Sequence, residues 1–90
     1  MKKRVHVLVK GRVQGVFYRQ SCKAKARILD IVGFAKNLPD GTVETVFEGE
    51  EEKVEEMIAF AKKGTPFAKV EDVTVKEEEF KNEFNSFEIR

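Results

Sequence analysis

The stretch Gly11-Arg12-Val13-Gln14-Gly15-Val16-Phe17-Tyr18-Arg19 marks the point where the chain changes from a strand period to a helix period. Before it, residues 5–10 (VHVLVK) place valines at every second position, which predicts a half-buried strand. After it, residues 19–31 contain no Gly or Pro, and Cys22 and Ala26 are spaced for one buried face of a helix. The stretch therefore predicts a glycine-containing loop between a strand and a helix.

The rest of the chain supplies two more strands, a second helix and two further strands. Pro39-Asp40-Gly41 is a tight-turn signal that predicts a hairpin. Acids begin the next apolar-periodic stretch and lysines end it, which suits the helix dipole, and Gly64 is placed as its cap. The expected elements are strands at 34–38 and 42–48, a helix at 50–63, and strands at 70–76 and 86–90, with a mobile polar bend over 76–84.

This order, β-α-β-β-α-β plus a short final strand, predicts an α+β fold. Two βαβ halves of this kind close as a ferredoxin-like split βαβ sandwich, with an antiparallel or mixed sheet and two helices on one face. With 90 residues, the chain is expected to form one domain, residues 1–90. We expect the phenylalanines, including Phe34, Phe47, Phe60 and Phe87, to lie in the core.

Composition excludes several classes of protein. One cysteine (Cys22) and one histidine (His6) exclude an internal disulfide framework, a cysteine zinc site and a multi-histidine metal site. No apolar run approaches the roughly 20 residues that cross a bilayer, and no signal-peptide pattern follows the basic start. We therefore expect a cytoplasmic protein that contacts no membrane. We also expect a monomer, because one sandwich accounts for each apolar stripe.

The charges are divided unevenly along the chain. The formal net charge is +1, which argues against a surface built for nucleic acid. Residues 1–37, however, hold ten Lys/Arg and one Asp, whereas residues 38–90 hold seven Lys/Arg and fifteen acids. The basic part contains the glycine loop, so we expect Arg12, Arg19 and Lys36 to attract a small anion.

The loop has the features of an anion site. Backbone N–H groups of a glycine-containing turn can converge on one point, and the start of the following helix adds free N–H groups and its positive dipole end. Arg19 adds a planar guanidinium that suits two phosphate oxygens. A plain glycine turn beside a surface arginine stays open as the alternative.

Asn37, in Gly33-Phe34-Ala35-Lys36-Asn37-Leu38-Pro39-Asp40-Gly41, is the second candidate. Its amide can donate and accept, so it can hold a water beside an anion without adding negative charge. On local grounds alone it could equally begin the turn.

Together, GRVQGVFYR and GFAKNLPDGTVE resemble the signature pair of the acylphosphatase family. The stretch from Gly64 to Val70 and the Phe87-Glu88-Ile89 ending are also similar to that family, so the resemblance spans almost the whole chain. It implies a ferredoxin-like fold and hydrolysis of the carboxyl–phosphate bond of acyl phosphates, without metal or cofactor. Tyr18 stands where Phe is common, which places a hydroxyl near the expected site.

The resemblance also implies roles for residues. Arg19 and Asn37 are the expected catalytic residues: Arg19 binds phosphate and Asn37 orients the attacking water. The substrate's own phosphate assists deprotonation of that water. The substrate-binding residues are Gln14, Gly15, Val16, Phe17, Tyr18 and Arg19.

Three other functions stay open. An RNA-recognition module shares the element order, but its readout needs stacking aromatics and basic residues on the open sheet face, and the strand at 42–48 is acidic with one aromatic. A module of a larger carbamoyl-transfer enzyme and a non-catalytic phosphate-binding regulator are the others. A small stand-alone hydrolase acting on an acyl phosphate, with no nucleic-acid partner, is our expectation.

Overall fold

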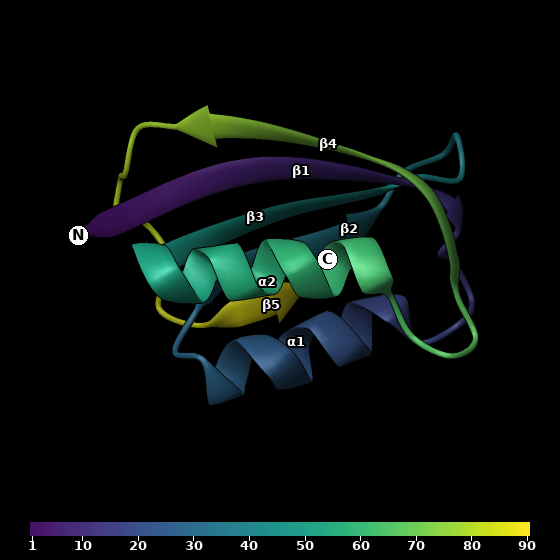
Figure 1. Cartoon of the computed structure of the whole chain (residues 1–90), viewed down its shortest axis with the longest axis horizontal. Coiled ribbons are helices and arrows are strands. Elements are labelled where there is room, and N and C mark those ends of the chain that lie inside the picture. The colour runs from purple at the N-terminus through teal and green to yellow at the C-terminus, as the bar shows by residue number, and fades with distance from the viewer.

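A computed structural model describes all 90 residues and places two helices on one face of a five-stranded sheet (Figure 1). The elements are β1 (Lys2–Arg12), α1 (Tyr18–Ile28), β2 (Val32–Asn37), β3 (Val43–Glu50), α2 (Glu51–Lys63), β4 (Lys69–Glu78) and β5 (Phe87–Ile89). The strand order is β4-β1-β3-β2-β5, antiparallel throughout except for the parallel β2–β5 pair. The predicted ferredoxin-like sandwich is confirmed, and the final strand extends it beside β2.

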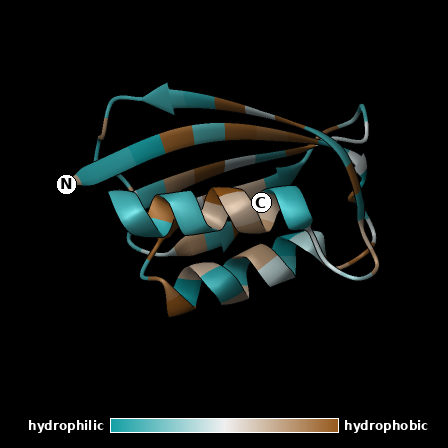
Figure 2. Ribbon diagram, viewed as in Figure 1, coloured by the Kyte–Doolittle hydropathy of each residue, from teal (hydrophilic) through white to brown (hydrophobic).

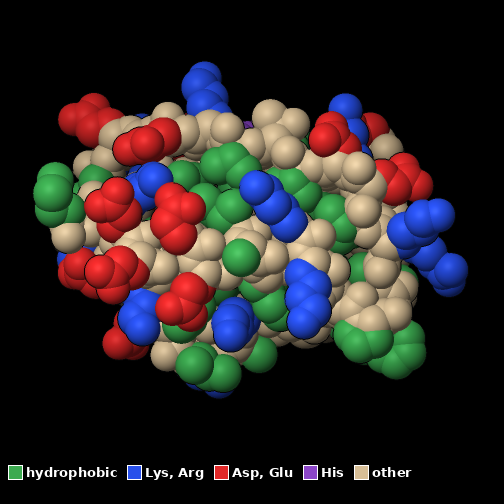
Figure 3. Space-filling model, in the orientation of Figure 1, with side chains coloured by type: hydrophobic (Ala, Val, Ile, Leu, Met, Phe, Trp, Pro, Cys, Tyr) green, Lys and Arg blue, Asp and Glu red, His purple; other side chains and the backbone are tan.

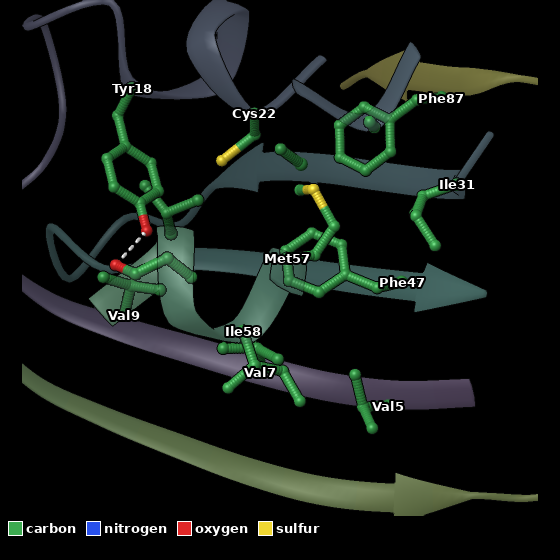
Figure 4. Close-up of a cluster of buried hydrophobic side chains, with 14 of the residues drawn as sticks. Val5, Val7, Val9, Tyr18, Cys22, Ile31, Phe47, Met57, Ile58 and Phe87 are labelled. Carbon is green, nitrogen blue, oxygen red and sulfur yellow. Dashed lines mark hydrogen bonds between the residues drawn. The ribbon is translucent and has the colours of Figure 1, made fainter. Parts of the chain in front are cut away.

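The main core lies between the sheet and the two helices. Figure 2 shows apolar and polar residues alternating along β1, and Val5, Val7 and Val9 are the buried members (Figure 4). Cys22 of α1 and Met57 of α2 are buried opposite them. Burying one such side chain is worth roughly 1.5–3 kcal/mol. In this packing α1 lies over β2 and β5, and α2 lies over β1, β3 and β4.

The first residue of β1 and the last residue of α1 differ from the predicted ones, because contacts rather than hydropathy decide where these elements begin and end. β1 begins at Lys2 because its first residues pair with β3, where Lys2 lies opposite Glu50 and the Lys2 ammonium lies 3.2 Å from a Glu50 carboxylate oxygen. α1 ends at Ile28 rather than at residue 31. Asp30 takes a left-handed φ of 56°, and the Ile31 N–H donates to the Ala26 carbonyl oxygen at 2.8 Å. That bond satisfies a carbonyl group at the helix end.

The polar stretch predicted as a mobile bend instead extends β4 to Glu78 and then returns across the open face of the sheet. The buried Glu48 carboxylate accepts the N–H groups of Lys81 and Asn82 at 2.9 and 3.0 Å. Phe84 packs on Phe34 with ring centroids 6.0 Å apart. Glu48 thus holds this segment through charge-assisted hydrogen bonds.

Phe34 is buried, as predicted, but it lies outside the cluster of buried side chains between the sheet and the helices. Adjacent residues of a strand point to opposite faces, and Phe34 alternates with Ala35, which faces the helices. Phe34 is buried on the open face instead, beneath Phe84 and the Arg90 guanidinium, whose carbon lies 4.3 Å from the ring centroid. The C-terminal segment is thereby held beside β2.

Neither helix is long and apolar enough to cross a membrane.

Candidate active site

The loop between β1 and α1 presents a row of free backbone donors. The N–H groups of residues 14–17 donate no hydrogen bond to any other backbone group, and the first N–H groups of a helix such as α1 have no intrahelical acceptor. Gly15 and Phe17 have left-handed φ values of 74° and 61°. Backbone of this kind curls N–H groups into an anion-binding concavity. A hollow of about 170 Å³ lies here, lined by Val13, Gly15, Phe17, Tyr18, Arg19 and Gln20.

Phe17 carries backbone strain at this loop. A left-handed conformation costs a residue with a side chain roughly 1–2 kcal/mol, and Phe17 is the residue that directly precedes α1. Its carbonyl oxygen still accepts the Ser21 N–H at 3.0 Å, so the helix begins without interruption. Such strain is typical of functional loops held by their surroundings.

Gln14 fastens the loop to the β2–β3 hairpin. Its side-chain Nε2 donates to the carbonyl oxygens of Leu38 and Thr42, both at 2.8 Å. Leu38 directly follows Asn37, so this amide joins the anion loop to the segment that carries the second candidate. Sequence reasoning assigned Gln14 to substrate binding; the structure gives its side chain a bracing contact and leaves its backbone N–H free.

We expect Gln14→Leu to lower stability by about 1–3 kcal/mol, because two carbonyl oxygens lose their donor while side-chain volume is nearly kept. The loop would also no longer be held at a fixed position relative to Asn37, so kcat is expected to fall. Urea unfolding and steady-state kinetics measure the two effects. Asn85→Leu, at an exposed amide beside β5, is the matched control; equal losses in both variants would contradict the bracing role.

Arg19 lies in the first turn of α1 and is half-buried. Its Nη1 donates to the main-chain oxygen of Arg90 at 2.9 Å, and the Arg90 N–H donates to the Ala35 carbonyl oxygen at 2.8 Å. Ala35 lies two residues before Asn37 on the same strand face. A guanidinium has five N–H groups, so Arg19 keeps donors for an anion while the C-terminal segment links it to β2.

Asn37 is the last residue of β2, opposite Val43 of β3. It shares the helix-facing side of β2 with Ala35, the side on which α1 and the loop lie. Its Oδ1 is buried and has no hydrogen-bond partner within the protein. Buried polar atoms are rarely left unpaired, so an amide oxygen in this state is suited to a water or a substrate.

The Tyr18 side chain turns away from the site, contrary to the expectation of a hydroxyl beside it. The hydroxyl is buried and donates to the Ala61 carbonyl oxygen at 2.7 Å, drawn as a dashed line in Figure 4. Burial raises the pKa of Tyr18 well above its usual value and raises the pKa of the neighbouring Cys22 thiol to about 12. Because the Tyr18 hydroxyl is buried and bonded to Ala61, only the Tyr18 backbone N–H is available to a ligand.

The two ends of β1 differ in how their basic side chains are paired. Lys3 and Arg4, at the other end of β1, pair with Glu55 and Glu83 at 2.8 and 2.6 Å. Three of the ten Lys/Arg side chains in residues 1–37, those of Lys2, Lys3 and Arg4, form ion pairs with acids from the rest of the chain, and the other seven form none. Arg12 and Arg19 form no ion pair with an acid.

Two other candidates lie away from the loop. Lys36 alternates with Asn37 and occupies the open sheet face, opposite Glu44, so it cannot flank a ligand in the loop. His6 also lies on that face, where its Nε2 is 2.8 Å from a Glu44 carboxylate oxygen. No group of three or more His, Cys, Asp or Glu side chains gathers as metal ligands would.

The fold and the loop together define a ferredoxin-like α+β protein with a cradle of free backbone N–H groups at the start of its first helix. Comparison with known proteins identifies the family. A family model described as Acylphosphatase matches residues 5–89. The acylphosphatase of Syntrophobacter fumaroxidans is 48% identical over 88 residues, which cover 98% of this chain and 91% of the relative.

Solved structures agree with the sequence match. An acylphosphatase from Coxiella burnetii superposes with a TM-score of 0.93 at 36% identity, covering 99% of this chain and 93% of the other. An acylphosphatase from Bacillus subtilis gives a TM-score of 0.93 at 34% identity, covering 100% and 99%. The chain belongs to the acylphosphatase family, enzymes that hydrolyse the carboxyl–phosphate bond of acyl phosphates.

Proposed function

We propose that this acylphosphatase holds the phosphate group of its substrate with the backbone N–H groups of the loop and with Arg19, while Asn37 positions the attacking water. The observation that carries the proposal is the row of free N–H groups at residues 14–17, which ends at the arginine in the first turn of α1. Donors fixed in this way are already aimed before the substrate arrives, so no reorganisation is needed during reaction.

The proposed reaction is attack of water on phosphorus. The water oxygen forms a bond to phosphorus as the bond from phosphorus to the carboxylate oxygen breaks, and the acyl group leaves as a carboxylate. The phosphate oxygens accept the proton that the water loses, so no protein base is needed. The protein's part is positioning and stabilisation of negative charge, the main demands of phosphoryl transfer.

Asn37 suits the task of orienting water because its amide is neutral. A carboxylate at this position would repel the phosphate, whereas an amide oxygen can accept a hydrogen bond from water and the NH₂ group can donate one. Support comes from the buried Oδ1 without a partner and from the Gln14 bridge, which ties the neighbouring Leu38 to the loop.

We propose further that residues 1–90 act as one domain, as a monomer in the cytoplasm, and that the substrate is a small-molecule acyl phosphate. The buried, unpaired Cys22 suits a reducing compartment. The open sheet face does not suit RNA, because Phe34 is covered by Phe84 and His6 faces Glu44. The aromatic platform that RNA bases stack on is therefore missing from that face.

The proposed reaction is expected to release inorganic phosphate from acetyl phosphate or benzoyl phosphate in the presence of excess chelator. Phosphate release in a colorimetric assay, with and without EDTA, measures this directly. Absence of release from both substrates would overturn the proposed function. Activity that vanishes with EDTA and returns with a divalent cation would overturn only the metal-free mechanism.

A further inference from the structure

Three large hydrophobic side chains are left exposed along one groove. Phe17 is 68% exposed, Ile28 77% and Phe67 71%. They line a groove of about 570 Å³ between α1 and the segment that follows α2, a volume within the usual range of small-molecule sites. Figure 3 shows hydrophobic side chains gathered at the end of the molecule where α1 begins and α2 ends. Exposed apolar patches of this kind commonly mark binding sites.

One face of α1 forms the first wall of the groove. Phe17, Ser21, Ala24 and Ile28 follow one another at the spacing of a single helix face. With a rise of 1.5 Å per residue, this wall is about 16 Å long. Phe60 of α2, with Pro66 and Phe67 after it, forms the other wall.

The groove is continuous with the phosphate cradle. Phe17 lines the cradle and the groove, and it also lines an intermediate hollow together with Arg12, Gly15, Val16, Pro66 and Phe67. The Phe17 N–H belongs to the free row of the loop, while its ring is exposed. A single residue therefore borders both the expected phosphate position and the apolar surface.

The chemistry of the groove restricts what fits it. Lys25 is the one charged residue that lines it, and no acid does. Apolar walls cannot replace the hydrogen bonds that a sugar hydroxyl or an amide makes with water, so such groups would lose free energy on entering. An apolar chain or ring gains free energy by leaving water.

From this continuity we infer that the groove is the binding site for the acyl group, and that the substrates are acyl phosphates with an apolar acyl group larger than acetyl. The inference rests on the proposed function, because the phosphate in the loop tethers the acyl group to the start of the groove. An acetyl group ends near Phe17. A six-carbon chain reaches towards Phe67.

The test compares acetyl phosphate with hexanoyl phosphate. Their carboxylate leaving groups have nearly the same basicity, so any difference in kcat/KM reports contacts along the chain. We expect hexanoyl phosphate to have a kcat/KM about tenfold higher, at the low end of what apolar contacts give in a pocket. In Phe67→Ser the ratio of kcat/KM for hexanoyl phosphate to kcat/KM for acetyl phosphate is expected to fall about fivefold, mainly through a higher KM for hexanoyl phosphate.

Phe80→Ser is the matched control, because Phe80 is partly exposed after β4 and lines neither the cradle nor the groove. It should leave the ratio unchanged. Equal kcat/KM values for the two substrates in the unmodified enzyme, or an unaltered ratio in Phe67→Ser, would overturn the groove assignment alone. Failure to hydrolyse either substrate would overturn the proposed function instead.

Discussion

Arg19→Ala is expected to lower kcat/KM at least about a thousandfold, the smallest contribution usually made by an arginine that stabilises phosphoryl transfer. The loop N–H groups would remain, but the full positive charge and its planar pair of donors would be lost. Inhibition by inorganic phosphate should weaken in parallel, since the same group binds the ground state. Initial rates with benzoyl phosphate and the inhibition constant of phosphate measure both effects.

The loss should not come from unfolding. Arg19 makes one hydrogen bond within the protein, an exposed one to Arg90, and the net worth of such a bond is about 0.5–1.5 kcal/mol. Arg19→Lys keeps the charge without the fork, so it should restore part of the phosphate inhibition but little of kcat. Arg27→Ala, exposed near the other end of α1, should behave like the unmodified enzyme. Phosphate inhibition of normal strength in Arg19→Ala would refute its role.

The sequence was informative wherever hydropathy alone decides the structure. The alternating valines of β1 and the apolar stripe of α2 depend on burial of one face, and both elements were predicted correctly. The start of β1 at Lys2 and the return of the chain across the open sheet face could not be predicted. They depend on partners distant in the chain, such as Glu50 for Lys2 and Glu48 for the segment after β4.

The candidate site was likewise predictable only in part. The glycine loop, Arg19 and Asn37 were proposed from local spacing and resemblance, and the structure brings them to one end of the sandwich. The opposite orientations of Tyr18 and Phe17 were not predicted. Which side chain is buried depends on the left-handed backbone at Phe17 and on the Ala61 acceptor in α2, and neither is visible in the local pattern.

Asn37→Ala is expected to lower kcat by about a hundredfold to a thousandfold, the usual cost of removing one positioned hydrogen-bonding group from a transition state. KM and phosphate inhibition should change little, because Arg19 and the loop still hold the phosphate. Asn37→Asp should lower kcat and also weaken the binding of substrate and of inorganic phosphate, since a carboxylate beside the loop repels the anion. Steady-state kinetics with phosphate as inhibitor separate these patterns.

Stability provides the second measurement on Asn37. The Oδ1 atom is buried without a partner, so its removal should leave the free energy of unfolding unchanged or slightly higher, as is common when functional polar groups are replaced. Asn85→Ala, an exposed amide beside β5, is the control and should affect neither property. A loss of activity in Asn37→Ala that is matched by a loss of about 2 kcal/mol or more in stability would instead assign Asn37 a structural role. Lost turnover in a protein of undiminished stability would show that the amide is kept for the reaction, with its oxygen available to the attacking water.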